Sequence, residues 1–180
     1  MRILKKVNFS EVLQAFDKEH AVNKGTNSWA RERLGNANDY FGGEWYYIRL
    51  SRKEILSGVE LIWHHDPSSG LKLIPETGLT VAKAKDKFLE IRQSYSRDNS
   101  DCYTKIIDFG DSAFNPIFLC TKPLKGFGIA EHEKLLHIEG NLVHIDGLHR
   151  LVAWAVAGKI NWFRYSFSKK INAFVAGHVS

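Results

Sequence analysis

The segment 141–158 constrains the fold more than any other part of the chain; its sequence is NLVHIDGLHRLVAWAVAG. The apolar run 142–145 predicts a strand that ends at a tight turn. Apolar residues then recur at helical spacing, at positions Leu148, Leu151, Val152, Ala155 and Val156. Gly158 is placed to end this helix as the left-handed residue past its last turn. A strand that leads directly into a helix is typical of a sheet with helices packed on it.

Other predicted helices and strands are interleaved irregularly along the chain. Helices are predicted over 11–20, 28–40, a short stretch to Ser57, 80–95 and 103–109, and the helix 80–95 is the longest of them. Ser10 and Thr80 are the expected caps of the first and the longest helix, and Ser51 with Glu54 forms a capping box for the short one. The predicted strands are 45–50, 59–64, 71–74, 116–119, a hairpin of 135–138 with 142–145, 163–167 and 173–175. We therefore expect an α/β (α+β) fold, one mixed sheet with flanking helices, in a single domain over residues 1–180.

Composition and charge exclude several classes of protein. No apolar run approaches the roughly 20 residues needed to span a bilayer, and the basic start has no apolar segment behind it. Cys102 and Cys120 are the only cysteines, which indicates two half-buried free thiols, a reducing compartment and a cytoplasmic location. The net charge of +5 is scattered, so a nucleic-acid partner is possible but not favoured, and membrane binding is not expected. The oligomeric state stays open.

The turn Asp146-Gly147-Leu148-His149-Arg150 is the predicted binding site. A helix start leaves about four backbone amides unpaired and carries about half a positive charge, which favours an anion. Gly147 lets a ligand approach the backbone, Arg150 can place two donors on one phosphate, and His149 adds a donor or a proton carrier. We expect Arg150 and Trp154 to stack at the rim of the helix, where Arg150 stays available.

Asp146 has several interpretations. As the expected helix N-cap, its carboxylate competes with a phosphate for the same amides. It then either holds a magnesium ion that bridges to the phosphate or binds a hydroxyl or amine of a second substrate. In the alternative, Asp146 only caps the helix and Arg150 pairs with a neighbouring acid.

This turn, with the hairpin before it and the Ala-rich helix after it, resembles the ParB/sulfiredoxin superfamily, where a strand ends in a motif such as Asp-Gly-x-x-Arg before a helix. Segments 106–110 and 115–119 are similar to the helix, glycine, Pro-Ile and strand element of that superfamily, and 48–55 to its first strand and short helix. The resemblance covers about 45–158 and implies a ParB/sulfiredoxin-like core behind an N-terminal helical extension. Over its whole length the chain resembles a bacterial family of unknown activity that carries the motif DGLHR.

The resemblance implies that Gly147, Leu148, His149 and Arg150 bind nucleotide phosphates, with Asp146 as a further candidate. Activities in the superfamily are CTP hydrolysis coupled to DNA partitioning, ATP-dependent sulfinic acid reduction and phosphorylation of free serine. Leu148 stands in the region where sulfiredoxin has a cysteine, and 159–180 is too short for the helix-turn-helix domain of ParB. The free serine kinases have the nearest motif, Asp-Gly-His-x-Arg, and Leu148 replaces its histidine.

Several other polar residues are candidates for acid–base chemistry. Glu131 and Glu133 lie in a glycine-containing loop that can act as a lid, so either is a general base or both are merely solvated. His144 is two residues before Asp146 on the same strand face, and Glu60 is a further candidate base. For 63–66 (Trp-His-His-Asp) we expect a polar turn rather than a metal site, because neighbouring strand residues point to opposite faces and no second His or Cys pair has ligand spacing.

Three hypotheses follow. The first is an enzyme that binds ATP or another nucleoside triphosphate with Mg²⁺ and transfers phosphate to a small hydroxyl metabolite, with Asp146, His149, His144, Glu131 or Glu133 as catalytic groups. The second is a non-catalytic module that binds a nucleotide or nucleic acid and regulates a partner. The third is an enzyme that acts on a phosphate- or sulfate-bearing metabolite without a nucleotide.

Overall fold

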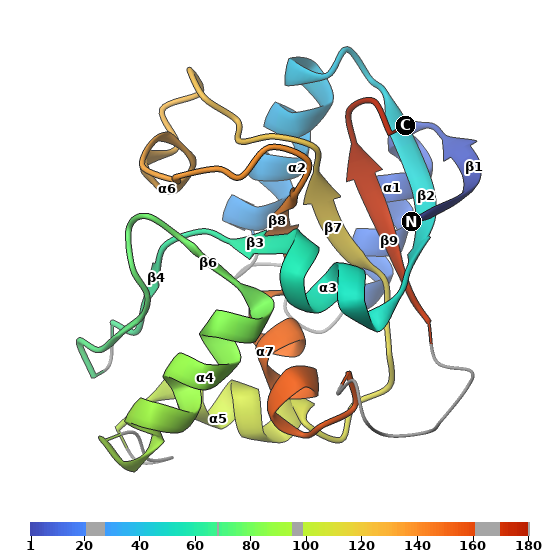
Figure 1. The fold of residues 1–180 in the computed structure, drawn as a ribbon. Coiled ribbons are helices and arrows are strands. Elements are labelled where there is room, and N and C mark those ends of the chain that lie inside the picture. The colour runs from blue at the N-terminus through green and yellow to red at the C-terminus, as the bar shows by residue number, and fades with distance from the viewer. Residues whose placement is uncertain (21–27, 68, 95–98, 161–169, 180) are drawn as a thin grey trace.

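A seven-stranded mixed sheet forms the centre of the computed structural model, which describes residues 1–20, 28–67, 69–94, 99–160 and 170–179 (Figure 1). The strand order is β1-β2-β9-β7-β8-β3-β6, with β1 (Arg2–Val7), β2 (Trp45–Leu50), β3 (Val59–Leu61), β6 (Leu79–Thr80), β7 (Ile117–Cys120), β8 (Leu142–Asp146) and β9 (Ile171–Ala176). β3 is parallel to β8 and β7 to β9, and the other neighbours are antiparallel. β4 (His64–His65) and β5 (Lys72–Ile74) form a separate hairpin. The expected mixed sheet of an α/β (α+β) fold is confirmed.

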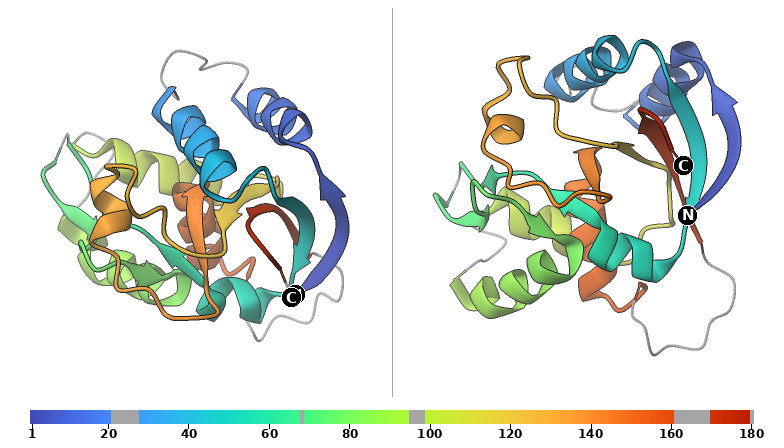
Figure 2. Two further views of the ribbon diagram at one scale, coloured as in Figure 1. Left: turned by 90° about the horizontal axis from the view of Figure 1, so that it is seen from above. Right: turned by 45° about the horizontal axis from the view of Figure 1, so that its top comes forward.

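Helices cover both faces of this sheet, as Figure 2 shows from two directions. α1 (Phe9–Glu19) and α2 (Ser28–Tyr40) pack on one face, and α4 (Val81–Ile91), α5 (Asp101–Phe109) and α7 (Leu148–Val156) pack on the other. The remaining helical elements are α3 (Arg52–Gly58), α6 (Ala130–Glu133) and a 3₁₀ turn, Arg92–Ser94. No described helix is long and apolar enough to cross a membrane.

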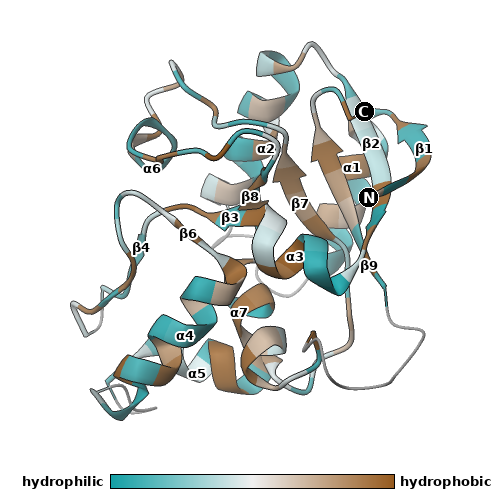
Figure 3. Cartoon of the chain, in the orientation of Figure 1, coloured by the Kyte–Doolittle hydropathy of each residue, from teal (hydrophilic) through white to brown (hydrophobic). Residues whose placement is uncertain are grey.

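Strand β7 shows why the sheet is buried on two sides. Ile117 and Leu119 pack with α4, α5 and α7, whereas Phe118 and Cys120 pack in the layer of α1 and α2. Because alternate side chains of a strand point to opposite faces, an entirely apolar strand has to lie at the centre of a two-sided core. Figure 3 shows the same contrast: β7 is hydrophobic along its length, and the edge strand β1 carries polar residues.

The caps of α1 and α3 are formed by residues directly before each helix and in its first turn. Ser51 accepts a hydrogen bond from the Glu54 N–H, and the Glu54 carboxylate accepts one from the Ser51 N–H, so the predicted capping box of α3 is confirmed. The predicted Ser10 cap of α1 is wrong. Asn8 caps this helix instead, because its Oδ1 accepts from the Glu11 N–H at 2.9 Å and the Glu11 carboxylate accepts from the Asn8 N–H.

The predicted hairpin of 135–138 with 142–145 is also wrong, because only its second half is a strand. The Ile138 N–H donates to the Glu60 carboxylate at 3.0 Å and the Leu136 N–H donates to the Thr77 carbonyl at 3.2 Å. These amides are therefore used outside a ladder, and β8 pairs with β7 and β3.

Other differences are smaller. The chain begins with strand β1, so the N-terminal extension is not only helical but adds the edge of the sheet. The predicted strand 59–64 ends at Leu61, and α4 ends at Ile91, which leaves α2 as the longer helix. The predicted strand 163–167 lies outside the described residues.

Candidate functional site

A pocket of about 730 Å³ opens at the carboxyl ends of the parallel strands β3 and β8. The chain leaves β3 through 62–65 and β8 through 146–150, and both segments line the pocket. Residues from four helices complete its walls, among them Glu19 and His20 at the end of α1, Trp29 and Arg33 of α2, Lys105 of α5 and Glu131 of α6. Ligands in open α/β sheets commonly bind at the carboxyl ends of strands, so this is the candidate functional site.

The turn before α7 lies in the wall of this pocket. Gly147, not Asp146, is the N-cap of α7, at φ +107°, and no side chain of the described residues caps this helix start. The predicted Asp146 cap is therefore wrong. A Cβ at Gly147 would lie 3.0 Å from Cγ2 of Ile117, so both the backbone angle and the neighbouring strand favour glycine here.

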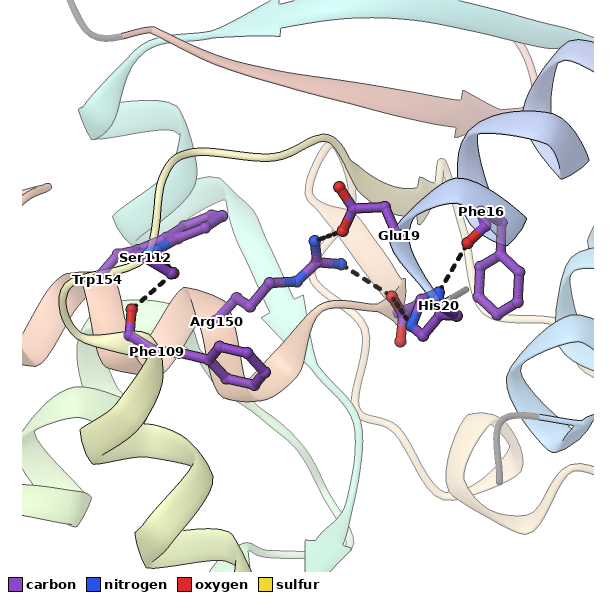
Figure 4. A network of polar contacts seen from close by, with 8 residues as sticks. Phe16, Glu19, His20, Phe109, Ser112, Arg150 and Trp154 are labelled. Atoms are coloured by element: carbon purple, nitrogen blue, oxygen red, sulfur yellow. Dashed lines mark hydrogen bonds and ion pairs between the residues drawn. The ribbon is translucent and has the colours of Figure 1, made fainter. Parts of the chain in front are cut away.

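Arg150 lies between two carboxylates (Figure 4). Its Nη1 donates to Glu19 of α1, and its Nη2 donates to Oδ2 of Asp146 at 3.0 Å. His20 Nε2 lies 3.7 Å from the same Asp146 oxygen. Burial raises the pKa of Glu19, and the Arg150 guanidinium opposes this shift. The guanidinium joins the end of α1 to the start of α7.

The predicted position of Arg150 at the helix rim, stacked with Trp154, is wrong. The Arg150 side chain is only 9% exposed and Trp154 is fully buried. The indole Nε1 of Trp154 donates to Ser112 Oγ at 3.0 Å (Figure 4). The Trp154 ring also meets Phe114 edge-on. Arg150 thus pairs with neighbouring acids, as the alternative interpretation expected, whereas Asp146 does not cap the helix as that interpretation also required.

Of the other predicted acid–base residues, His144 and Glu131 lie at the pocket and Glu133 does not. His144 Nδ1 accepts from the Ile62 N–H at 3.0 Å, so the neutral ring carries its proton on Nε2. Burial lowers the pKa of His144 well below its usual value. Glu131 forms an ion pair with Arg33, whereas the Glu133 carboxylate accepts from the Gly126 N–H at 2.6 Å.

Glu60 also does not line the pocket. It is 3% exposed and pairs with His137, a contact that fixes the segment before β8. Its position therefore supports a structural role for this carboxylate rather than that of a base.

His64, Cys102 and His149 meet at the pocket although they come from β4, α5 and α7. One potential ligand atom from each lies within 4.8 Å of the other two, and the imidazole rings of His64 and His149 meet edge-on at 4.9 Å. Burial lowers the pKa of His64 to about 4 and that of His149 to about 3, and it raises the pKa of the Cys102 thiol to about 12. All three groups are therefore uncharged at neutral pH.

Asp66 provides negative charge beside this cluster. It is 1% exposed and opposes the lowering of the pKa of both His64 and His149. Its Oδ2 accepts from Ser69 Oγ at 3.0 Å and from Ser100 Oγ, and Ser100 also caps α5. The segment 63–66 is not the expected polar turn: His64 and His65 form strand β4, which brings His64 to partners that are far away in the sequence. His65 stacks on Trp63 instead, so the two adjacent histidines do not share one site.

Sequence reasoning did not identify Glu19, Lys105, Cys102 or Asp66 as site residues. Glu19 and Lys105 are charged residues on helices and carry no local pattern that separates them from solvated ones. Both cysteines are free, as expected, and both are buried rather than half-buried. Only the topology brings Cys102 to the two histidines.

Comparison with curated proteins and with solved structures gives no match. No relationship to the ParB/sulfiredoxin superfamily emerges from the comparisons, and one family model matches the chain over residues 1–180. That model describes a family of unknown function, and its match spans the entire sequence. The chain therefore belongs to the family DUF6309.

Proposed function

We propose that this protein is a small enzyme that binds a phosphate-bearing small molecule, in the specific form a nucleoside triphosphate with Mg²⁺, in the pocket at the start of α7. The observation that carries the proposal is the uncapped amino end of α7 in the wall of a pocket of about 730 Å³. Pockets of roughly 300–1,000 Å³ accommodate ligands of nucleotide size.

Backbone amides supply the first part of the phosphate site. Leu148, His149 and Arg150 form the first turn of α7, whose N–H groups have no acceptor within the helix. Gly147 presents no side chain in front of them, and the residues 147–150 all line the pocket. The amino end of the helix dipole adds positive potential at the same place.

Lysine supplies the charge that Arg150 does not. Arg150 is neutralised by Glu19 and Asp146, and Arg33 by Glu131. Lys105 lines the pocket, is exposed and has no ion pair within the described residues. Its positive charge contributes to the lowered pKa of His149, which places Lys105 within electrostatic reach of the α7 start. In this proposal Lys105 and the amides bind phosphate, and Arg150 holds the turn in place.

The remaining groups have roles in phosphate transfer to a small hydroxyl compound. In this proposal Asp146 binds a Mg²⁺ ion that enters with the triphosphate, since Mg²⁺ is commonly bound through one or two carboxylates and the substrate phosphates. In the same proposal Glu131 is the base for the acceptor hydroxyl, and neutral His144 is a further polar contact for the ligand. The resemblance of the turn to the free serine kinases of the ParB/sulfiredoxin superfamily supports this form of the proposal.

Calorimetric titration tests the binding half. ATP, CTP and inorganic phosphate are titrated with and without Mg²⁺ into the wild type, Lys105→Gln and the control Lys83→Gln, a solvent-exposed lysine of α4 outside the pocket. We expect Lys105→Gln to weaken the bound ligand about tenfold, the size of one charge-assisted hydrogen bond, and Lys83→Gln to have no effect. Equal losses in both variants, or no binding of any of the three ligands, would overturn the proposal.

Phosphate release tests the catalytic half. The wild type is incubated with the nucleotide that binds and with a panel of amino-acid and polyol acceptors, and release or transfer of phosphate is followed. Acceptor-dependent turnover supports a kinase. Binding without turnover identifies a regulatory nucleotide-binding module, and binding of inorganic phosphate alone indicates a phosphorylated metabolite as substrate.

A further inference from the structure

We propose that His64, Cys102 and His149 form a binding site for Zn²⁺ or a similar divalent transition-metal ion at the wall of the pocket. The inference goes beyond phosphate binding and does not depend on it, because the ion alone tests it. It assigns a metal-ligand role to His149, which the sequence indicated only as a hydrogen-bond donor to phosphate or a proton carrier. It assigns the same role to His64 and Cys102, which had no assigned role.

The geometry of the three groups fits a metal site. Their potential ligand atoms lie within 4.8 Å of one another. Zn–S and Zn–N bonds of about 2.3 and 2.0–2.1 Å place tetrahedral ligand atoms somewhat less than 4 Å apart, so a small movement of side chains closes the site. His149 Nε2 is buried without a hydrogen-bond partner among the described residues. An unpaired buried nitrogen is costly, and an added ligand that satisfies the ring removes this cost.

The chemistry of the donors selects a transition metal over Mg²⁺. Two imidazoles and one thiol are ligands of Zn²⁺ and related ions, whereas Mg²⁺ and Ca²⁺ prefer oxygen. The histidines are already neutral, as metal ligands must be. The buried thiol needs a cation to become a thiolate, and a divalent ion with the Cys102 thiolate and the Asp66 carboxylate sums to no net charge.

The rest of the structure holds the three ligands in place. The Ser100 side chain caps α5 and donates to Asp66, so the loop after β4 is tied to the helix that carries Cys102. α7 carries His149 and packs directly on α5. Hydrogen-bonded partners outside the ligand set usually orient metal ligands in this way.

The site leaves one coordination position for the pocket. Among the described residues the group consists of three ligands, and Zn²⁺ takes four. His64 and His149 both line the pocket, so the fourth ligand is water or a substrate atom that enters there. Three protein ligands with one open position are the arrangement of catalytic rather than structural zinc sites.

Cobalt titration of the chain of residues 1–180 tests the proposal. Protein freed of metal by a chelator is titrated with Co²⁺ under anaerobic, reducing conditions, and the visible and near-ultraviolet spectra are recorded. We expect one Co²⁺ per chain, the intense visible bands of a four-coordinate ion, a thiolate-to-cobalt charge-transfer band, and displacement of Co²⁺ by Zn²⁺. No binding, or binding without the charge-transfer band, would overturn the proposal.

Matched variants assign the ligands. Cys102→Ala, His64→Gln and His149→Gln should each weaken Co²⁺ binding by more than the roughly 10–100-fold loss caused by an outer-shell partner. Cys120→Ala removes the other buried thiol and His65→Gln the adjacent histidine, and both should retain the wild-type affinity and spectrum. Because the chain has only two cysteines, the band in Cys120→Ala assigns Cys102 even where Cys102→Ala does not fold. Loss of the band in Cys120→Ala, or its retention in Cys102→Ala, contradicts the assignment.

Discussion

Arg150 illustrates how one residue serves the architecture of the site. Its guanidinium contacts Glu19 and Asp146, and the three side chains are 9%, 13% and 14% exposed. One positive charge therefore balances two partly buried negative ones. Removing it leaves both carboxylates in a region where water cannot replace the lost partner, which is costly.

We expect Arg150→Met to lower the free energy of unfolding by about 3–5 kcal/mol, as for the loss of one partner of a buried ion pair. Urea denaturation measures this value. Combining Arg150→Met with Glu19→Gln and Asp146→Asn should recover most of the loss, because no unpaired charge remains. Arg31→Met is the control: Arg31 pairs with Asp17 on the surface, at 47% and 48% exposure, and its loss should cost about 0–1 kcal/mol. A similar small effect at Arg150 contradicts this account.

The contacts of Arg150 could not be predicted residue by residue. Its position in the first turn of a helix and its spacing from Trp154 were visible locally, but Glu19 lies 131 positions away. The same holds for Cys102, which meets His64 and His149 only through the packing of α5 on α7. Ligand spacing along the sequence identifies sites whose ligands share one element, and it is silent where three elements contribute one ligand each.

At the scale of elements, the turn between β8 and α7 was predictable because its determinants are local. An apolar run, a glycine and an apolar helical stripe follow one another, and the structure has β8, a left-handed Gly147 and α7 in that order. The capping box of α3 was predictable for the same reason. The hairpin prediction failed because apolar residues in 135–138 resemble a strand, while Leu136 and Ile138 are 70% and 53% exposed and their amides bond elsewhere.

Gly147 offers a test of this turn. Gly147→Ala places a Cβ at φ +107° and 3.0 Å from Cγ2 of Ile117, a fully buried residue of the central strand. Gly140→Ala has a comparable φ of +86°, but its Cβ meets no atom of the described residues within 4 Å. We expect Gly147→Ala to be less stable than Gly140→Ala by about 1–3 kcal/mol, the usual size of overpacking, in urea denaturation. Equal losses would mean that the turn moves away from Ile117 without resistance.

At the scale of the whole molecule, the pocket lies where both helical layers meet one end of the sheet. α1 and α2 reach it from one face, and α5 and α7 from the other, because β3 and β8 are parallel and end there together. Burial around this region keeps several histidines neutral. His132 and His144 each use Nδ1 to accept a backbone N–H, from Leu124 and Ile62, which fixes both in the neutral form.

These histidines make the stability of the fold depend on pH. Burial lowers the pKa of His132 to about 4, with Arg33 acting in the same direction and Glu131 opposing it. In the unfolded chain the pKa of this ring returns to about 6.5. The unfolded state therefore binds a proton that the folded state does not accept, so the contribution of His132 is fully present above about pH 6.5 and is lost as the pH falls toward 4.

We expect the free energy of unfolding to fall between pH 7 and pH 5 by about 2 kcal/mol for His132 alone, from the linkage between its two pKa values. His132→Gln keeps an acceptor for the Leu124 N–H but does not titrate. Its free energy of unfolding should therefore fall between pH 7 and pH 5 by about 2 kcal/mol less than that of the wild type. His65→Gln, which removes an exposed ring, should follow the wild type. Urea denaturation of the metal-free proteins at both pH values separates the cases. The same pH dependence in His132→Gln and wild type would show that the buried His132 ring accepts its proton without disturbing the fold. Burial would then not control the charge of this histidine.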